Sequence, residues 1–331
     1  MTNSGLDEDH LPLGVRQALS GLEASHPPGA EGRALLAVAA IHELVRGWSG
    51  PEAARLAATE ALIDRIINTA QGTAHQPGVR NAIAFMTSGT LPADRVQAEA
   101  VLAERRRWIE TTFAASEEQM AAAGAALVES GDRILVHDYA EHSTQAVVRR
   151  AAEEGKRLEI IATACRSRRA DGLRVADEAL ALGHSVWVVT DAGIAWAMTN
   201  FKVVAAFLGA DSVIHDGSLL TTPGALAIGL AARMARVPVY AVADLWKVEE
   251  HFSPALQSIN QTEDPDGVPE ALEWSARGLH YLNPLVDVVP GELITAFITE
   301  HGAISPAQVG ATSLAVRSAA ASAGQSATLL P

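Results

Sequence analysis

From residue 131 onward, short apolar runs alternate with stretches of helical periodicity, and this alternation limits the possible folds more than any other feature of the chain. The apolar runs cover residues 133–136, 158–162, 185–189, 203–207 together with 212–214, and 238–242. The helical stretches between them cover residues 143–154, 172–182, 192–198 and 224–235. Strands and helices that alternate at this spacing build βαβ units and a parallel sheet. Because such crossovers are nearly always right-handed, we predict an open, doubly wound, Rossmann-like sheet.

The first part of the chain has a different pattern, because its apolar residues recur at helical spacing. We predict helices near residues 15–22, 33–48, 51–69, 80–86 and 93–128. The expected α/β architecture is therefore an N-terminal helical domain followed by a Rossmann-like doubly wound parallel sheet. We expect its parts to be a helical domain over residues 1–125, a Rossmann-like domain over 126–310 and a flexible tail over 311–331.

Composition narrows the class of protein. Hydrophobic residues make up 48% of the chain, which is enough for a sizeable core. Cys165 is the single cysteine, so no disulfide can form within one chain, and a reducing compartment is expected. We find neither a secretion signal nor a run of about 18 apolar residues, and therefore expect a cytoplasmic protein with no membrane partner. A net charge of −14 argues against a nucleic-acid partner.

Polar residues follow each predicted strand. In open parallel sheets, ligands bind outside the carboxyl ends of the strands. The strand-end residues are His137 and Asp138, residues 163–166, Thr190 and Asp191, Asp211 and Ser212, and Asp244 with Lys247. The pattern favours a binding site at this edge of the sheet, although loops are commonly polar for solvation alone.

Two carboxylates at this edge are candidates for acid/base chemistry. Asp211 follows the compact sequence Leu208-Gly209-Ala210, and a carboxyl group beside a buried surface suits proton transfer. Asp138 is a possible second carboxylate, and paired carboxylates can divide acid and base roles. The alternatives are that Asp211 caps a turn and that Asp138 caps the helix beginning near Ser143.

Other residues at the edge carry weaker signals. Arg166, Arg168 and Arg169 form a basic cluster that suits phosphate oxygens or is simply solvated. Pro223-Gly224 opens a helix whose N-terminus is a possible anion site, but no nucleotide-binding glycine motif accompanies it. Cys165 is either a nucleophile or, more commonly for such a residue, a buried filler. His137 and His142 form no recognisable metal-ligand set, and we expect no metal.

Several of these segments resemble the initiation factor 2B-like family. They are residues 134–139 (Ile-Leu-Val-His-Asp-Tyr), 162–166, 189–192, 209–212, 242–247 and 283–302. Arg46 and Gly47, followed by Pro51, resemble the family's Arg-Gly site. The resemblance spans residues 46–302 in the correct order and implies a helical domain, a Rossmann-like domain and a homodimer or higher homo-oligomer.

The family contains two kinds of member. Some are sugar-phosphate isomerases that act on ribose 1,5-bisphosphate or methylthioribose 1-phosphate, and others are non-catalytic regulatory subunits of the translation-initiation guanine-nucleotide exchange factor. Lys247 is more similar to the bisphosphate and regulatory branch. The resemblance implies a small-molecule sugar phosphate as the partner.

The chain departs from the family at its ligand edge. The isomerases carry a cysteine where this chain has Asp138, whereas Asp211 matches their Gly-Ala-Asp motif. The family's Asn-Lys-Ile-Gly-Thr segment corresponds to residues 221–225, which lack the lysine. Its Thr-Glu-Thr-Arg-Pro segment corresponds to residues 163–167, which keep Arg166 and lack the glutamate. A carboxylate at position 138 still preserves a proton acceptor.

We therefore predict a divergent aldose–ketose isomerase that acts on a phosphorylated or modified pentose and needs no cofactor. Asp211 and Asp138 are the predicted catalytic residues. The predicted substrate-binding residues are Arg46, Gly47, Arg166, His137, Asp191, Lys247 and Asp216. One variant of this hypothesis keeps the site but changes the reaction to dehydration or epimerisation. The alternative is a non-catalytic ligand-sensing or assembly protein like the regulatory subunits.

Overall fold

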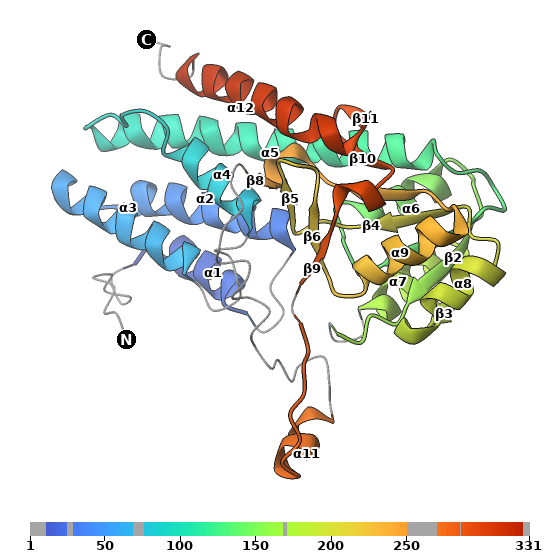
Figure 1. The fold of residues 1–331 in the computed structure, drawn as a ribbon. Coiled ribbons are helices and arrows are strands. Elements are labelled where there is room, and N and C mark those ends of the chain that lie inside the picture. Colours follow the sequence, from blue (N-terminus) through green and yellow to red (C-terminus); the bar gives the residue numbers. More distant parts are fainter. Residues whose placement is uncertain are drawn as a thin grey trace. The chain divides into compact units, whose positions relative to one another are not determined.

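The computed structural model describes residues 11–24, 29–68, 76–167, 171–249, 270–284 and 286–326 (Figure 1). These residues group into two compact units. The first contains the described residues of Met1–Ala114 and Ser313–Pro331, and the second contains those of Ala115–Thr312.

The first unit is helical in its described part, as its apolar periodicity predicts. Its helices are α1 (Leu13–Leu22), α2 (Ala30–Gly47), α3 (Glu52–Ile67), α4 (Pro77–Met86) and the first part of α5 (Arg95–Ala125). Helices α1, α3 and α4 all pack against α2. Val38, Ile41 and Leu44 of α2 are completely buried, because they repeat at the spacing that places side chains on one helix face.

The second unit contains a seven-stranded sheet with the order β11-β10-β7-β4-β1-β2-β3. Its strands are β1 (Arg133–His137), β2 (Glu159–Thr163), β3 (Ser185–Val189), β4 (Ala205–Leu208), β7 (Val239–Val242), β10 (Ala296–Thr299) and β11 (Gly302–Ile304). All pairs are parallel except β10 with β11. The predicted Rossmann-like α/β fold is thus confirmed.

Helices accompany this sheet (Figure 1). They are α6 (Thr144–Glu153), α7 (Gly172–Ala181), α8 (Ile194–Asn200) and α9 (Ala225–Ala235), and the short α11 (Ala271–Ala276) lies further along the chain. Alternate strand residues such as Val136, Ile160 and Phe207 share one buried cluster with Val147 of α6 and Val175 of α7. The period-2 alternation of strand side chains therefore builds the core on this face.

A second, four-stranded sheet has the order β8-β5-β6-β9. Its strands are β5 (Ser212–Ile214), β6 (Leu219–Thr221), β8 (Val248–Glu249) and β9 (Asp287–Val289). Residues 212–214 were expected to continue the strand region of 203–207, and this expectation is wrong. The chain leaves the large sheet at Gly209, and the Asp211 amide instead donates to the Leu220 carbonyl at 3.0 Å, so that β5 forms a hairpin with β6.

The C-terminal part also differs from the expected pattern. Strands β9, β10 and β11, each of three or four residues, were not predicted. The tail expected to be flexible from Ala311 contains α12 (Val309–Ser326), whose sequence is rich in alanine, the residue with the highest helix propensity. Short 3₁₀ helices cover Asp191–Gly193, Leu245–Lys247, Gly291–Leu293 and Pro306–Gln308.

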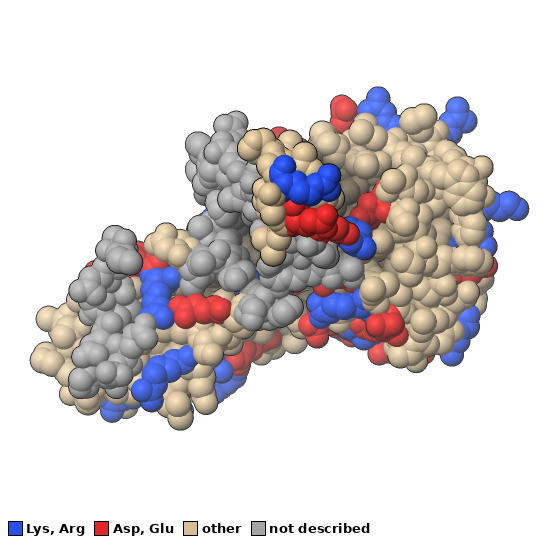
Figure 2. Space-filling model, turned by 90° about the horizontal axis from the view of Figure 1, so that it is seen from below, with Lys and Arg blue, Asp and Glu red and all other residues tan. Residues whose placement is uncertain are grey.

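The described surface mixes charges of both signs, and Figure 2 shows acidic and basic side chains interspersed on one face. Arg149, for example, pairs with Glu178 at 2.7 Å and with Glu117 at 3.1 Å. None of the helices in the described residues has the length and apolarity that crossing a bilayer would require.

Candidate functional site

The strand order has its topological switch point between β1 and β4, because the chain runs outward from this pair in both directions. His137, the last residue of β1, pairs with Leu208, the last residue of β4. The loops that follow these strands approach closely, since a Cβ built on Gly209 would lie 2.7 Å from the Ala140 Cβ. Asp138 and Asp211 therefore belong to adjoining loops at the switch point.

Asp138 sits on a left-handed backbone, with φ of 66°. Its Oδ2 accepts a hydrogen bond from the Thr222 hydroxyl, and its Oδ1 lies 3.8 Å from the Cys165 Sγ. The alternative role as a cap for α6 is not observed, since the N-cap residue is Ser143. The carboxylate instead connects the ends of β1 and β2 with the segment before α9.

Asp211 is half-buried at the start of β5. Among the described residues, its carboxylate has no hydrogen-bond or ion-pair partner, so its oxygens are not committed to another described side chain. Its amide is bonded to Leu220, two residues before the Thr222 that holds Asp138. The β5–β6 hairpin thus links the two predicted catalytic residues through a short stretch of backbone.

His137 is buried and forms internal contacts. Its Nδ1 lies 2.7 Å from the Thr163 hydroxyl and its Nε2 lies 3.3 Å from the Thr222 carbonyl. The ring also explains why residue 224 is glycine, because a Cβ there would lie 2.9 Å from the His137 Cε1. The φ of +113° at Gly224 favours glycine as well. His137, which was predicted to bind substrate, therefore connects the ends of β1 and β2 with the start of α9 through these internal contacts.

The loop after β2 is organised by Asp191. The two carboxylate oxygens of Asp191 accept the amides of Cys165 at 2.9 Å and Arg166 at 2.8 Å. The Arg166 guanidinium is exposed and lies 3.8 Å from the Glu270 carboxylate. Arg168 and Arg169, the other members of the predicted basic cluster, lie outside the described residues.

The N-terminus of α9, which the sequence indicated as a weak anion site, already holds a carboxylate. Asp287 Oδ2 accepts the amides of Gly224 at 2.8 Å and Leu226 at 3.0 Å. A carboxylate at this position satisfies free amides and complements the helix dipole. A ligand phosphate would have to displace Asp287 to bind there.

A buried charged cluster lies at the ends of β7 and β10. Lys247 Nζ lies 3.7 Å from Asp244 Oδ2, and both side chains are more than nine-tenths buried. Glu300, which follows β10, accepts the Leu245 amide with both carboxylate oxygens, at 3.2 and 3.1 Å. Burial raises the pKa of Glu300 to about 7, and the nearby Asp244 carboxylate adds to the rise.

This raised pKa predicts a specific dependence of stability on pH. The folded protein holds the Glu300 proton more tightly than the unfolded chain, whose pKa is near the ordinary 4.5. The free energy of unfolding should therefore fall as pH rises from about 4.5 to about 7, by on the order of 3 kcal/mol. Glu300→Gln should remove this fall, as urea unfolding across the pH range would measure. The exposed Glu292→Gln variant should retain it; a Glu300→Gln curve parallel to wild type would contradict the assignment.

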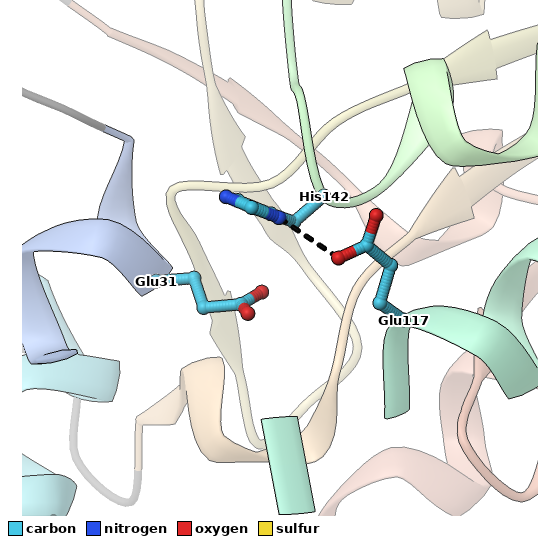
Figure 3. A group of neighbouring side chains, drawn as sticks. All are labelled: Glu31, Glu117 and His142. Atoms are coloured by element: carbon cyan, nitrogen blue, oxygen red, sulfur yellow. Dashed lines mark hydrogen bonds and ion pairs between the residues drawn. The ribbon is translucent and has the colours of Figure 1, made fainter. Parts of the chain in front are cut away.

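His142 lies in the loop between β1 and α6, where its Nδ1 lies 2.9 Å from Glu117 Oε2 (Figure 3). The same glutamate also pairs with Arg149 through its other oxygen. His142 and Arg149 therefore share Glu117 as a partner, in a network that joins the β1–α6 loop with α5 and α6.

Three further predicted binding residues belong to elements other than the strands of the large sheet. Asp216 is exposed in the β5–β6 turn, where its carboxylate accepts the Ser218 amide at 2.8 Å. Arg46 and Gly47 end α2 in the first unit. Arg46 pairs with Glu43 at 2.7 Å, and a Cβ on Gly47 would meet the Pro12 ring at 2.7 Å.

Sequence reasoning missed several residues that shape the site. Asp287 and Glu300 were within a segment quoted for the family resemblance and Thr222 was within a segment that departs from the family, but none of the three was assigned a role. Glu300 could have been found from the apolar run before it and Gly302 after it, which together mark a strand end. Nothing local in the sequence indicates that Thr222 contacts Asp138, because 84 residues separate them.

The fold and the edge residues define a class: a Rossmann-like α/β protein with aspartates on both loops of its switch point, the position where such sheets bind small ligands. Comparison with known families is more specific. The chain belongs to the Initiation factor 2 subunit family, which matches residues 28–306.

Curated relatives include ribose 1,5-bisphosphate isomerase of Archaeoglobus fulgidus, which is 30% identical over 204 residues, covering 60% of this chain and 61% of the relative. Methylthioribose-1-phosphate isomerase of Thermotoga neapolitana is 29% identical over 198 residues, covering 55% and 56%. The matches thus span about 60% of these relatives. Translation initiation factor eIF-2B of Pyrococcus horikoshii OT3 has the same fold, with a TM-score of 0.71 at 21% identity over 89% of this chain and 98% of that one.

Proposed function

We propose that this protein is a divergent aldose–ketose isomerase acting on a phosphorylated or modified pentose. The observation that carries the proposal is the position of Asp138 and Asp211 on adjoining loops at the switch point of the sheet. The names of the curated relatives supply the substrate class, since they are isomerases of ribose 1,5-bisphosphate and methylthioribose 1-phosphate.

In the proposed reaction, Asp211 removes a proton from the carbon next to the carbonyl and returns it to the former carbonyl carbon. Asp138 acts as the acid/base partner that moves a proton between the two oxygens. The charge that develops on oxygen needs positioned donors, and Arg166 and Lys247 are the proposed cations for phosphate or hydroxyl oxygens. We propose that the protein acts in the cytoplasm as a homodimer or larger homo-oligomer and that the reaction uses no cofactor.

A panel of pentose phosphates in heavy water tests the proposal. Proton NMR should show aldose–ketose interconversion, with solvent deuterium entering the product at the carbon that receives the proton. Interconversion without deuterium would indicate a hydride shift and would remove Asp211 from its role. Absence of interconversion across ribose 1,5-bisphosphate, methylthioribose 1-phosphate and the pentose monophosphates would contradict the proposed activity.

The second candidate is a non-catalytic ligand-sensing or assembly protein. The structural likeness to translation initiation factor eIF-2B supports it, as does the lack of a lysine in residues 221–225. The double variant Asp138→Ala/Asp211→Ala separates the candidates: an enzyme loses turnover and keeps its fold, whereas a sensor has no turnover to lose.

A further inference from the structure

We propose that Cys165 and Thr222 are positioning residues that hold the two carboxylate oxygens of Asp138 in one orientation. The inference rests on the proposed function insofar as Asp138 serves the reaction, but the geometry itself can be tested without turnover. It gives the single cysteine of the chain a role that its sequence position does not indicate.

The thiol is placed by the neighbouring strand. Cys165 has a left-handed backbone with φ of 51° and is fully buried. Its amide donates to Asp191 Oδ1 at 2.9 Å, and the preceding Ala164 amide donates to the Val189 carbonyl at 2.7 Å. These two bonds attach the loop to the end of β3, and the Sγ then lies 3.8 Å from Asp138 Oδ1.

The Thr222 hydroxyl contacts Asp138 from a different loop of the fold. Thr222 is buried and lies between β6 and α9, where its carbonyl also contacts the His137 ring at 3.3 Å. Its hydroxyl donates to Asp138 Oδ2. Replacement by valine would keep the shape of the side chain and remove the donor.

Together the two donors occupy different oxygens of the same carboxylate. A carboxylate held by donors on both oxygens cannot rotate freely about its terminal bond. Supporting hydrogen bonds of this kind keep a reacting group within the narrow range of geometry that catalysis requires. Asp138 therefore works as a unit with Cys165 and Thr222 rather than as an isolated carboxylate.

Turnover measures the consequence of losing each donor. Cys165→Ala should lower kcat about 3- to 10-fold, and Thr222→Val should lower it about 10- to 100-fold, because a hydroxyl is a stronger hydrogen-bond donor to a carboxylate than a thiol. KM should change little, since neither side chain is expected to contact substrate. Cys165→Ser and Thr222→Ser keep a donor at each position and should restore most of the rate. Equal kcat in Cys165→Ala and wild type would overturn the role of the thiol.

Infrared spectroscopy tests the geometry independently of any activity. Because Cys165 is the only cysteine, the S–H stretching band of the full chain belongs to it alone. Asp138→Gly removes the carboxylate without straining a backbone at φ of 66°, and it should shift this band toward the frequency of an unbonded thiol. An unchanged band would overturn the proposal even if the protein is an active isomerase. A shifted band in a protein without turnover would leave the geometry standing and reject the proposed function.

Discussion

Replacing Asp211 by asparagine is expected to lower kcat/KM for aldose–ketose interconversion by about 10²- to 10⁴-fold, the usual contribution of a general acid/base group. Asparagine has the same shape as aspartate but cannot accept and return a proton. The Asp211 amide bond to Leu220 involves the backbone and should survive the change. The rate of deuterium incorporation into product in heavy water measures the effect directly.

The matched control is Asp177→Asn, because Asp177 is exposed on α7 and lies outside the proposed site. It should retain the wild-type rate. If Asp211→Asn were to exchange deuterium as fast as the control, Asp211 would not be the group that transfers the proton. A loss of rate accompanied by unfolding, which circular dichroism would detect, would instead assign Asp211 a structural role.

Truncating Phe207 to alanine is expected to reduce the free energy of unfolding by about 3–5 kcal/mol, the range observed for buried aromatic residues. Phe207 lies on β4 opposite Val136 of β1, is 1% exposed and has its ring centroid 5.5 Å from that of Tyr240. The variant leaves a cavity in the buried cluster that Phe207 shares with residues of β1, β2, α6 and α7.

Guanidinium unfolding of the wild type and the variant measures this loss through the shift in midpoint. Leu230→Ala on α9 is the control, because that side chain is 51% exposed and its truncation should cost less than about 1 kcal/mol. A loss from Phe207→Ala no larger than that of the control would show that the site collapses around the cavity or that the core is looser than its burial indicates.

The agreement between the predicted and the observed structure differs between elements. Strands β1, β2 and β3 lie within one residue of their predicted positions, because each is a short apolar run followed by a polar residue. Residues 212–214 were assigned to the wrong sheet. A strand propensity specifies extended backbone but not its partner, and here the partner is the hairpin strand that follows.

The candidate site was likewise predictable only in part. That polar residues would collect at one edge followed from the parallel order of the strands. The contacts at that edge did not follow, because Asp138 meets Thr222 across 84 residues and Gly224 meets Asp287 across 63. The domain boundaries and the roles of the site residues remain predictions.

Local patterning alone therefore determined the alternation of strands and helices, the helical first unit and the family resemblance, since each depends on neighbouring residues. The tertiary structure alone determined which of the polar side chains meet. It assigns Asp191 to the Cys165 loop, Asp287 to the start of α9 and Glu300 to a buried cluster with Asp244. The physical reason is that hydrogen bonding depends on distances of about 3 Å between atoms, and these are set by strand order and register rather than by sequence spacing.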